Sequence, residues 1–301
     1  MSAGFEPVGD RRVDEHAAPG RDDQRRFTGK LSWVSGVLPS TRWIVRVFYA
    51  VLKGADKERR SREDRGIKRK HTPEHLVHTK PCELALIWID AFWQHGSKMI
   101  TRVFSFKAAS KGLAIIVDAS PWSVGGILAH IAPGKVIQVA ASRNIESDEK
   151  QLGVKIGFAG SQGILETLAI WVFLRLWRRF FTDRQRVPIL RSDSRAAISS
   201  AEKLASGTPF MNHLAAELAL MMELHGIVTP EVRHLPGKLN VCADHTSRID
   251  APPEDQEPVP PELTGVRIRD VVVPSAGRPF LLPTASLRPD LWSGSVEDEA
   301  E

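Results

Sequence analysis

The chain has 301 residues, of which 42% are hydrophobic, and it carries a formal net charge of +5 at pH 7. This length and apolar content are sufficient for one sizeable domain with a packed core. Cys82 and Cys242 form no disulfide or metal-binding pattern, the chain starts without a secretory signal, and arginines interrupt its most apolar stretch. We therefore expect an intracellular, soluble protein of the cytoplasm or nucleus, neither secreted nor membrane-bound.

Charge is unevenly distributed along the chain. Lys57–Lys70 holds eight basic residues against three acidic ones, whereas the segment from Glu254 to the end holds ten acids and four arginines. A basic band of this kind is typical of a surface that binds a polyanion such as nucleic acid, and equally of a solvated linker. Both interpretations remain open from composition.

The first 111 residues predict mainly helical and unstructured segments. Residues 1–26 are polar and charged, which is typical of disorder. Residues 27–54 predict a short helical hairpin with Thr41–Lys53 as its second helix. About 26 residues cannot bury their own core, so this piece needs a partner surface. Residues 55–80 predict a basic linker and 81–111 a connecting helix, with an apolar helical stripe at 83–94.

Residues 112–250 carry the signals of an organised domain. Leu113–Asp118 is a continuous apolar run that ends in an aspartate, the pattern of a strand covered on both faces. Two more strands follow, joined by Ala132-Pro133-Gly134-Lys135, which fits a type II turn. The later segments complete the order β-β-β-α-β-α-α-β-α: Gln162–Phe181, Pro188–Ser192, Ser194–Leu204, Pro209–His225, Glu231–Leu235 and a short helix from about Ala243.

This order predicts an α/β fold with a mixed five-stranded sheet flanked by helices. Beyond Ala251, nine prolines fall within 50 residues beside the acidic groups. Residues 251–301 are therefore expected to form a disordered, proline-rich acidic tail.

Glu166 occupies an unusual place in the predicted helix 162–181. At 100° per residue it lies between Ile170 and Phe173 and above Trp177, at the centre of the apolar face. A buried unpaired charge costs several kcal/mol, so this carboxylate must be neutral, pair with an arginine, or bind a cation. A glutamate that merely reaches solvent is the alternative.

Three aspartates share a placement at the ends of predicted elements. Asp118 and Asp193 follow strands, and Asp244 opens a short helix. Asp193 and Asp244 are each explained equally well as ordinary helix N-caps. Together with Glu166, however, the three could converge on one edge of the sheet. Clustered carboxylates repel one another unless divalent cations lie between them, and oxygen-only ligands favour Mg²⁺ or Mn²⁺.

Four blocks containing these carboxylates resemble the RNase H domain of retroelement reverse transcriptases. They are Ile-Val-Asp118-Ala-Ser, Leu-Glu166-Thr-Leu-Ala, Ser-Asp193-Ser-Arg-Ala-Ala and Arg233-His234-Leu-Pro236-Gly237-Lys-Leu-Asn240-Val-Cys-Ala-Asp244-His-Thr-Ser-Arg248. The last block is close to the His-x-Pro-Gly-x-x-Asn-x-x-Ala-Asp-x-x-Ser-Arg run of that family. The resemblance spans about 112–250 and implies an RNase H-like domain there.

A shorter block, Gly29–Trp43, resembles the segment that closes the polymerase portion of DIRS-like and related retrotransposon enzymes. Residues 27–54 are accordingly interpreted as a reverse-transcriptase remnant. The polymerase's Tyr-x-Asp-Asp signature is absent, so we expect no DNA polymerisation by this chain, which looks like part of a larger element protein. The chain also departs from many relatives at Ser194, where they have Asn, and at His245-Thr246, where they have Ala-Leu.

The resemblance implies an endonuclease that cleaves the RNA strand of RNA–DNA hybrids with two Mg²⁺ or Mn²⁺ ions. Asp118, Glu166, Asp193 and Asp244 would bind the ions, and His234 would assist proton transfer and product departure. Implied partners are the hybrid and the polymerase portion of the element protein. The remaining residues are expected to contact nucleic acid: Ser120, Trp122, Ser194, Arg195, Lys238, Asn240 and Arg248.

Two alternatives for the domain and one each for His234 and Trp122 stay open. The domain could be an inactive RNase H fold kept as a nucleic-acid-binding tether, or a DNA nuclease or transposase of the same fold. His234 could be a strand-end histidine with one backbone bond, and Trp122 could be a packing residue rather than one that stacks on a base.

Overall fold

The computed structural model of the chain describes residues 21–64, 82, 83, 85, 86, 89, 112–132, 134–143, 155, 158, 161–181 and 187–271. The expectations for residues 1–20, 65–81 and 272–301, including positions 65–70 of the basic run, lie outside the described residues. Of the helix expected at 83–94, positions 83, 85, 86 and 89 are described and are helical.

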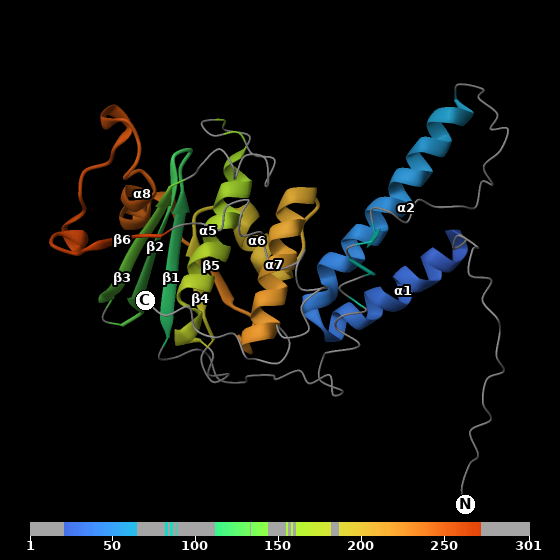
Figure 1. Cartoon of the computed structure of the whole chain (residues 1–301), viewed down its shortest axis with the longest axis horizontal. Coiled ribbons are helices and arrows are strands. Elements are labelled where there is room, and N and C mark those ends of the chain that lie inside the picture. Colours follow the sequence, from blue (N-terminus) through green and yellow to red (C-terminus); the bar gives the residue numbers. More distant parts are fainter. Residues whose placement is uncertain are drawn as a thin grey trace, which may run out of the picture.

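A mixed six-stranded sheet forms the centre of the molecule, in the order β5-β4-β1-β2-β3-β6 (Figure 1). The first three strands form an antiparallel meander, because β2 runs antiparallel to β1 and β3, while the other neighbouring strands pair in parallel. The strands are β1 (Leu113–Ala119), β2 (Ser123–His130), β3 (Val136–Arg143), β4 (Ile189–Ser192), β5 (Glu231–His234) and β6 (Ile268–Asp270). The predicted α/β class is confirmed.

The prediction of five strands is wrong, and so is the expectation that disorder begins at residue 251. β6 pairs with β3 through Val139 and Ile268, and residues 251–267 lead the chain from α8 (Val241–Ser247) to this edge. Leu263 is buried against Ile127 and Val139 in a second apolar cluster. The proline-rich composition did not predict an ordered segment, because the order of these residues depends on their packing against the sheet.

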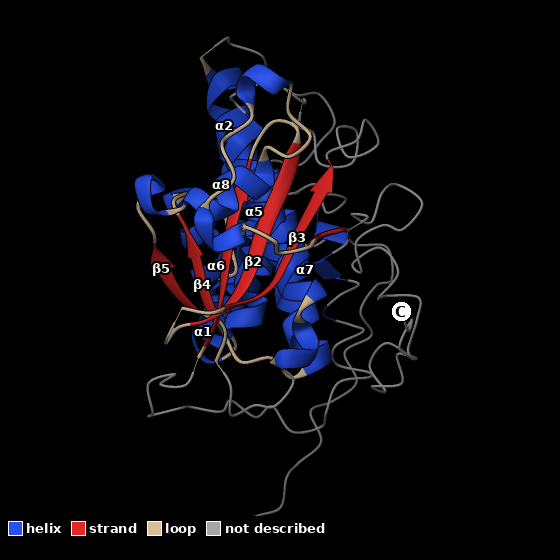
Figure 2. Cartoon of the chain, turned by 90° about the vertical axis from the view of Figure 1, so that its left-hand side faces the viewer, coloured by secondary structure: helices blue, strands red, loops and turns tan. Residues whose placement is uncertain are grey.

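Helices cover both faces of the sheet. α5 (Gln162–Leu176), α6 (Arg195–Lys203) and α7 (Pro209–His225) lie on one face, and α8 lies on the other, as Figures 1 and 2 show. Adjacent glycines in β2 permit this close packing. A Cβ at Gly126 would overlap the ring of Phe173, and one at Gly125 would overlap the backbone of α8 at Ser247. The helix expected at 162–181 ends at Leu176, followed by a short 3₁₀ turn, Arg178–Phe180.

Of the N-terminal helices, α2 (Arg42–Glu63) packs against α7, and α1 (Arg21–Val37) packs against α2 (Figure 1). Trp43, Ile44 and Phe48 belong to the main core, and Asn212 Nδ2 donates to the Trp43 carbonyl at 3.2 Å. α7 is therefore the partner surface that this hairpin requires. Both helices are longer than predicted: α1 starts inside the segment expected to be disordered, and α2 continues into the expected linker.

Candidate metal centre

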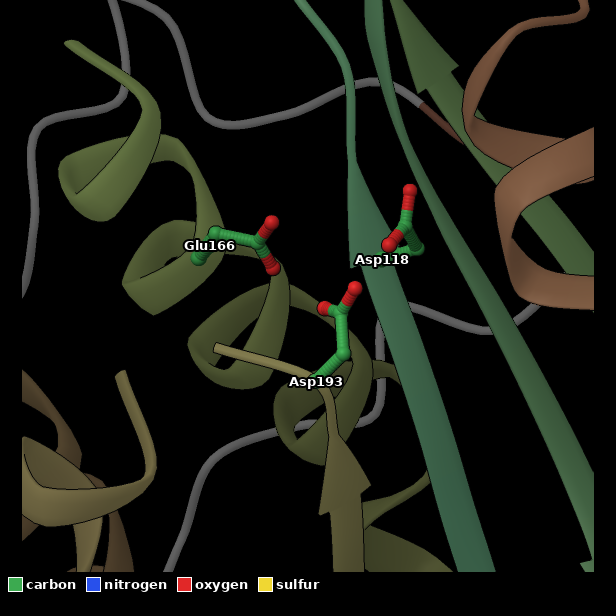
Figure 3. A group of neighbouring side chains, drawn as sticks. All are labelled: Asp118, Glu166 and Asp193. Atoms are coloured by element: carbon green, nitrogen blue, oxygen red, sulfur yellow. The ribbon is translucent and has the colours of Figure 1, made fainter. Parts of the chain in front are cut away.

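Three carboxylates meet at the carboxyl edge of the sheet. Asp118 lies near the end of β1 and Asp193 directly follows β4, its parallel neighbour, in which Arg191 is aligned with Ile116. Glu166 reaches the same point from α5, which packs across β1. Oxygen atoms of Asp118, Glu166 and Asp193 all lie within 4.8 Å of one another (Figure 3). The predicted convergence of these three residues is present in the structure.

Glu166 is 5% exposed and has only neutral hydrogen-bond donors around it in the described part of the chain. Gln162 Nε2 donates to its Oε1 at 2.9 Å, and Ser192 Oγ lies 3.5 Å from its Oε2. The arginine pair that burial could have required is absent among the described residues. Gln162 also donates to the Ala119 carbonyl, so it ties α5 to β1 beside the site.

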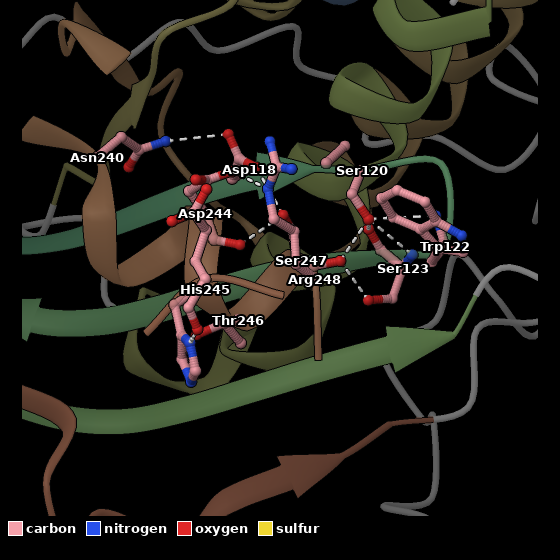
Figure 4. A network of polar contacts seen from close by, with 12 residues as sticks. Asp118, Ser120, Trp122, Ser123, Asn240, Asp244, His245, Thr246, Ser247 and Arg248 are labelled. Carbon is pink, nitrogen blue, oxygen red and sulfur yellow. Dashed lines mark hydrogen bonds and ion pairs between the residues drawn. The ribbon is translucent and has the colours of Figure 1, made fainter. Parts of the chain in front are cut away.

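Asp118 is also 5% exposed, and a donor approaches each of its two carboxylate oxygens. Asn240 Nδ2 lies 3.2 Å from Oδ1, and Ser247 Oγ lies 2.7 Å from Oδ2 (Figure 4). Ser247 and Gln162 are not among the site residues predicted from the sequence. For Gln162 a signal existed, since a residue four positions before Glu166 shares its helix face.

Burial and mutual repulsion shift the acidity of the two buried groups. Burial, and secondarily the charge of Asp118, raises the pKa of Glu166 to about 8. Burial raises the pKa of Asp118 to about 7, with the Ser247 hydrogen bond opposing and the charges of Asp244 and Asp193 adding to the shift. The site is therefore short of positive charge, which is the condition that a divalent cation relieves.

Asp244 stands apart from the other three carboxylates. Its Oδ1 forms an ion pair with Arg248 Nε at 2.7 Å within α8 (Figure 4), and it does not belong to the cluster whose oxygens lie within 4.8 Å. Its charge still acts on Asp118. The structure therefore brings together three of the four carboxylates predicted to bind metal. Asp244 stays a prediction as a ligand.

The N-cap alternatives for Asp193 and Asp244 are not supported. The residue that caps α6 is Ser194, whose Oγ accepts from the Ala197 N–H at 3.3 Å. α8 begins after Asn240, three residues before Asp244. The Asp193 carboxylate instead belongs to the cluster, and the Asp244 carboxylate pairs with Arg248.

His234 Nε2 lies 3.1 Å from the Asp193 carbonyl oxygen, and the side chain is exposed. This hydrogen bond agrees with the alternative interpretation of His234 as a strand-end histidine with one backbone bond. Because its acceptor belongs to Asp193, it also places the imidazole ring next to the carboxylate cluster. A carbonyl can only accept, so Nε2 carries the proton, and Nδ1 bears the lone pair when the ring is neutral.

The residues expected to contact nucleic acid fall into two groups. Ser120 and Asn240 are buried and hydrogen-bonded within the protein, so neither presents the surface group that direct contact requires. The others are at least partly exposed: Trp122, Ser194, Arg195, Lys238 and Arg248.

Among the described helices, none is long and apolar enough to cross a bilayer.

Comparison with protein families and with curated proteins finds no match. Among solved structures, LC11-RNase H1, isolated from compost by a metagenomic approach, is 15% identical with a TM-score of 0.35, covering 44% of this chain and 91% of that one. The foamy viral protease-reverse transcriptase dRH in complex with double-stranded DNA is 10% identical with a TM-score of 0.28, covering 74% of this chain and 33% of that one.

Proposed function

We propose that the chain is a metal-dependent endonuclease that cleaves the RNA strand of RNA–DNA hybrids as part of a retroelement reverse transcriptase. The observation that carries the proposal is the cluster of Asp118, Glu166 and Asp193 within 4.8 Å, two of them buried. Three of the four sequence blocks that resemble retroelement RNase H domains contain these residues, and the resemblance of all four supplies the substrate class.

The residues present fit Mg²⁺ or Mn²⁺. The donor set is oxygen only, which suits these hard cations better than zinc. Asp118 and Glu166 are buried and form no ion pair with a basic side chain in the described part of the chain, and a cation would favour their ionised forms. Asp118, Glu166 and Asp193 would bind the metal, with Asp244 available at the edge of the site. When bound, such ions activate a water molecule and stabilise the leaving oxygen of a phosphodiester.

The chain's own residues would supply positioning and proton transfer. Gln162 fixes Glu166 through its 2.9 Å hydrogen bond. His234 lies at the solvent side of Asp193, where its Nδ1 could accept and release a proton near the leaving group. Lys238, Arg195 and Arg248 would contact phosphates, and hybrid shape and 2′-hydroxyl groups would select the substrate.

The test is cleavage of labelled substrates by the full chain. An RNA–DNA hybrid, duplex DNA and duplex RNA are incubated with protein in Mg²⁺, in Mn²⁺ and in chelator, with Asp118→Asn as the control for contaminating nuclease. We expect cleavage of the hybrid's RNA strand in either metal and none in chelator or with the variant. Equal cleavage of duplex DNA would instead favour the DNA nuclease alternative. Hybrid binding without cleavage would favour the inactive tether.

A further inference from the structure

The carboxylate of Asp118 is held by two donors that come from the segment around α8. Asn240 lies immediately before this helix and Ser247 ends it, and they bond to different oxygens of the same carboxylate, at 3.2 and 2.7 Å (Figure 4). Asn240 is 2% exposed and Ser247 is fully buried. A carboxylate offers about four lone-pair directions, so two donors restrict both its rotation and the directions left for a cation.

These two donors are themselves fixed to the strands. Asn240 Nδ2 is shared with the Val117 carbonyl at 3.2 Å, next to Asp118 in the chain. The Ser247 carbonyl accepts from the hydroxyls of Ser120 and Ser123, each at 2.5 Å, in the turn between β1 and β2. Gly125 lets the backbone of α8 lie directly against β2. α8 is thus locked in one position relative to Asp118.

Asn240 is explained better by its effect on the orientation of the Asp118 carboxylate than by a contribution to the stability of the fold. Its Oδ1 is buried and has no donor among the described residues. A buried acceptor without a donor is a cost that an apolar residue would avoid. Against this cost, the amide Nδ2 donates two hydrogen bonds, one to the Val117 carbonyl and one to the Asp118 carboxylate.

We propose that Asn240 and Ser247 are positioning residues that orient Asp118 as a cation ligand, so that α8 sets the metal affinity of the cluster. The inference rests on the metal centre of the proposed function. Neither residue touches the substrate in this scheme; both act through Asp118. For Asn240, this positioning role takes the place of the direct nucleic-acid contact that the resemblance implies.

The test compares Ser247→Ala with a matched control, Thr246→Val. Both substitutions remove one fully buried hydroxyl from the same turn of α8, but the Thr246 hydroxyl donates to the Cys242 carbonyl within the helix, away from Asp118. Mn²⁺ binding to the full chain without nucleic acid is measured by calorimetry. Because loss of an outer-shell partner typically costs about 10–100-fold in metal affinity, we expect Ser247→Ala to weaken binding by about 10-fold or more and Thr246→Val by less than about twofold.

Asn240→Ala provides a second variant, which removes the other donor if Ser247→Ala does not fold. On labelled hybrid, either variant should lower kcat at limiting Mg²⁺ with KM for the hybrid unchanged, and excess Mg²⁺ should restore part of the rate. Folding is checked by circular dichroism.

Wild-type Mn²⁺ affinity in both folded variants would overturn the inference, as would an equal loss in Thr246→Val. A wild-type chain that binds no Mn²⁺ would overturn it as well. Weakened Mn²⁺ binding in Ser247→Ala beside a wild type that cleaves no hybrid would support the inference and overturn only the proposed nuclease activity.

Discussion

At the scale of single residues, Glu166 shows how burial and charge together constrain function. Its side chain is 5% exposed at the centre of the α5 face that meets the sheet, and the charges of Asp118 and Asp193 both raise its pKa. Such a group lowers stability whenever it is ionised without a cation. Its presence is therefore hard to explain by folding and is readily explained by metal binding.

Glu166→Gln should separate these two roles. Glutamine keeps the shape and the hydrogen-bonding head but removes the charge, so metal-free stability at pH 8 should hold or rise. Cleavage should fall by more than about 100-fold, since losing a ligand costs more than losing an outer-shell partner. Thermal melts with and without Mg²⁺, together with rates per folded molecule, measure both effects. A large loss of stability with cleavage unchanged would remove Glu166 from the site.

At the scale of elements, the site depends on how closely two helices approach β2. The ring of Phe173 in α5 lies over Gly126, and the backbone of α8 at Ser247 lies over Gly125, on opposite faces of the same strand. The Cβ that an alanine would add meets a side chain at Gly126 but backbone atoms at Gly125. A side chain can change rotamer, whereas a helix backbone must move as a unit.

Gly125→Ala should therefore displace α8 and lower Mn²⁺ affinity and cleavage together. Gly126→Ala is the matched comparison: we expect overpacking against Phe173 to cost about 1–3 kcal/mol of stability, with cleavage per folded molecule largely kept. Denaturant unfolding and Mn²⁺ calorimetry check the pair. If Gly125→Ala binds Mn²⁺ like the wild type, the position of α8 does not control the site.

At the scale of the whole molecule, the domain extends past the segment that resembles an RNase H domain. Leu263 is 3% exposed and packs with Ile127 and Val139, and β6 covers the edge of β3. An uncovered strand edge and apolar face are liabilities for aggregation. The chain from Ala251 to Val271 thus completes the fold.

Truncation tests this extended boundary. A chain ending at Asp250 should be less stable by at least the roughly 1.5–3 kcal/mol that burial of one leucine contributes, and it should aggregate more readily. A chain ending at Val271 keeps β6 and is expected to match the full-length protein. Chemical denaturation and light scattering distinguish the two. Equal stability of both truncations would place the domain end near residue 250.

The buried carboxylates also make stability depend on pH. The pKa of Glu166 is raised from 4.5 to about 8 and that of Asp118 from 3.8 to about 7, so the folded state retains protons that the unfolded chain has released. The contribution of these two groups to metal-free stability falls as pH rises from about 4 to 8, approaching a slope of about 1.4 kcal/mol per pH unit for each proton. Burial lowers the pKa of His225 from 6.5 to about 4 and also lowers that of His213, which opposes this trend below about pH 6.5, so the net fall is expected between about pH 6.5 and 8.

Mg²⁺ binds the ionised carboxylates, so its stabilising effect should grow over the same pH range. Urea unfolding at several pH values, in chelator and in Mg²⁺, measures both trends, and Glu166→Gln should flatten the chelator curve. A metal-free stability that rises between about pH 7 and 8, above the range in which the histidines titrate, would contradict the assigned burial of these groups.

The sequence by itself determined the features that depend on local pattern. The apolar run before Asp118, the strand before Asp193 and the helical spacing around Glu166 are each encoded within a few residues, so the convergence of these three carboxylates could be predicted. The bounds of α7 were likewise predictable, because Pro209 opens the helix and Gly226 ends it in the left-handed conformation.

Only the tertiary structure decided which groups surround those carboxylates. Ser247 lies 129 positions from Asp118, and no periodicity links the two. Asp244 pairs with Arg248 instead of joining the cluster, a choice between neighbours that depends on where α8 lies. β6 was not predicted from the sequence for the same reason. Its few residues form a strand because they pair with the edge of β3, and the preceding segment packs on the apolar surface of Ile127 and Val139. Contacts between distant segments are selected by packing, which local composition does not specify.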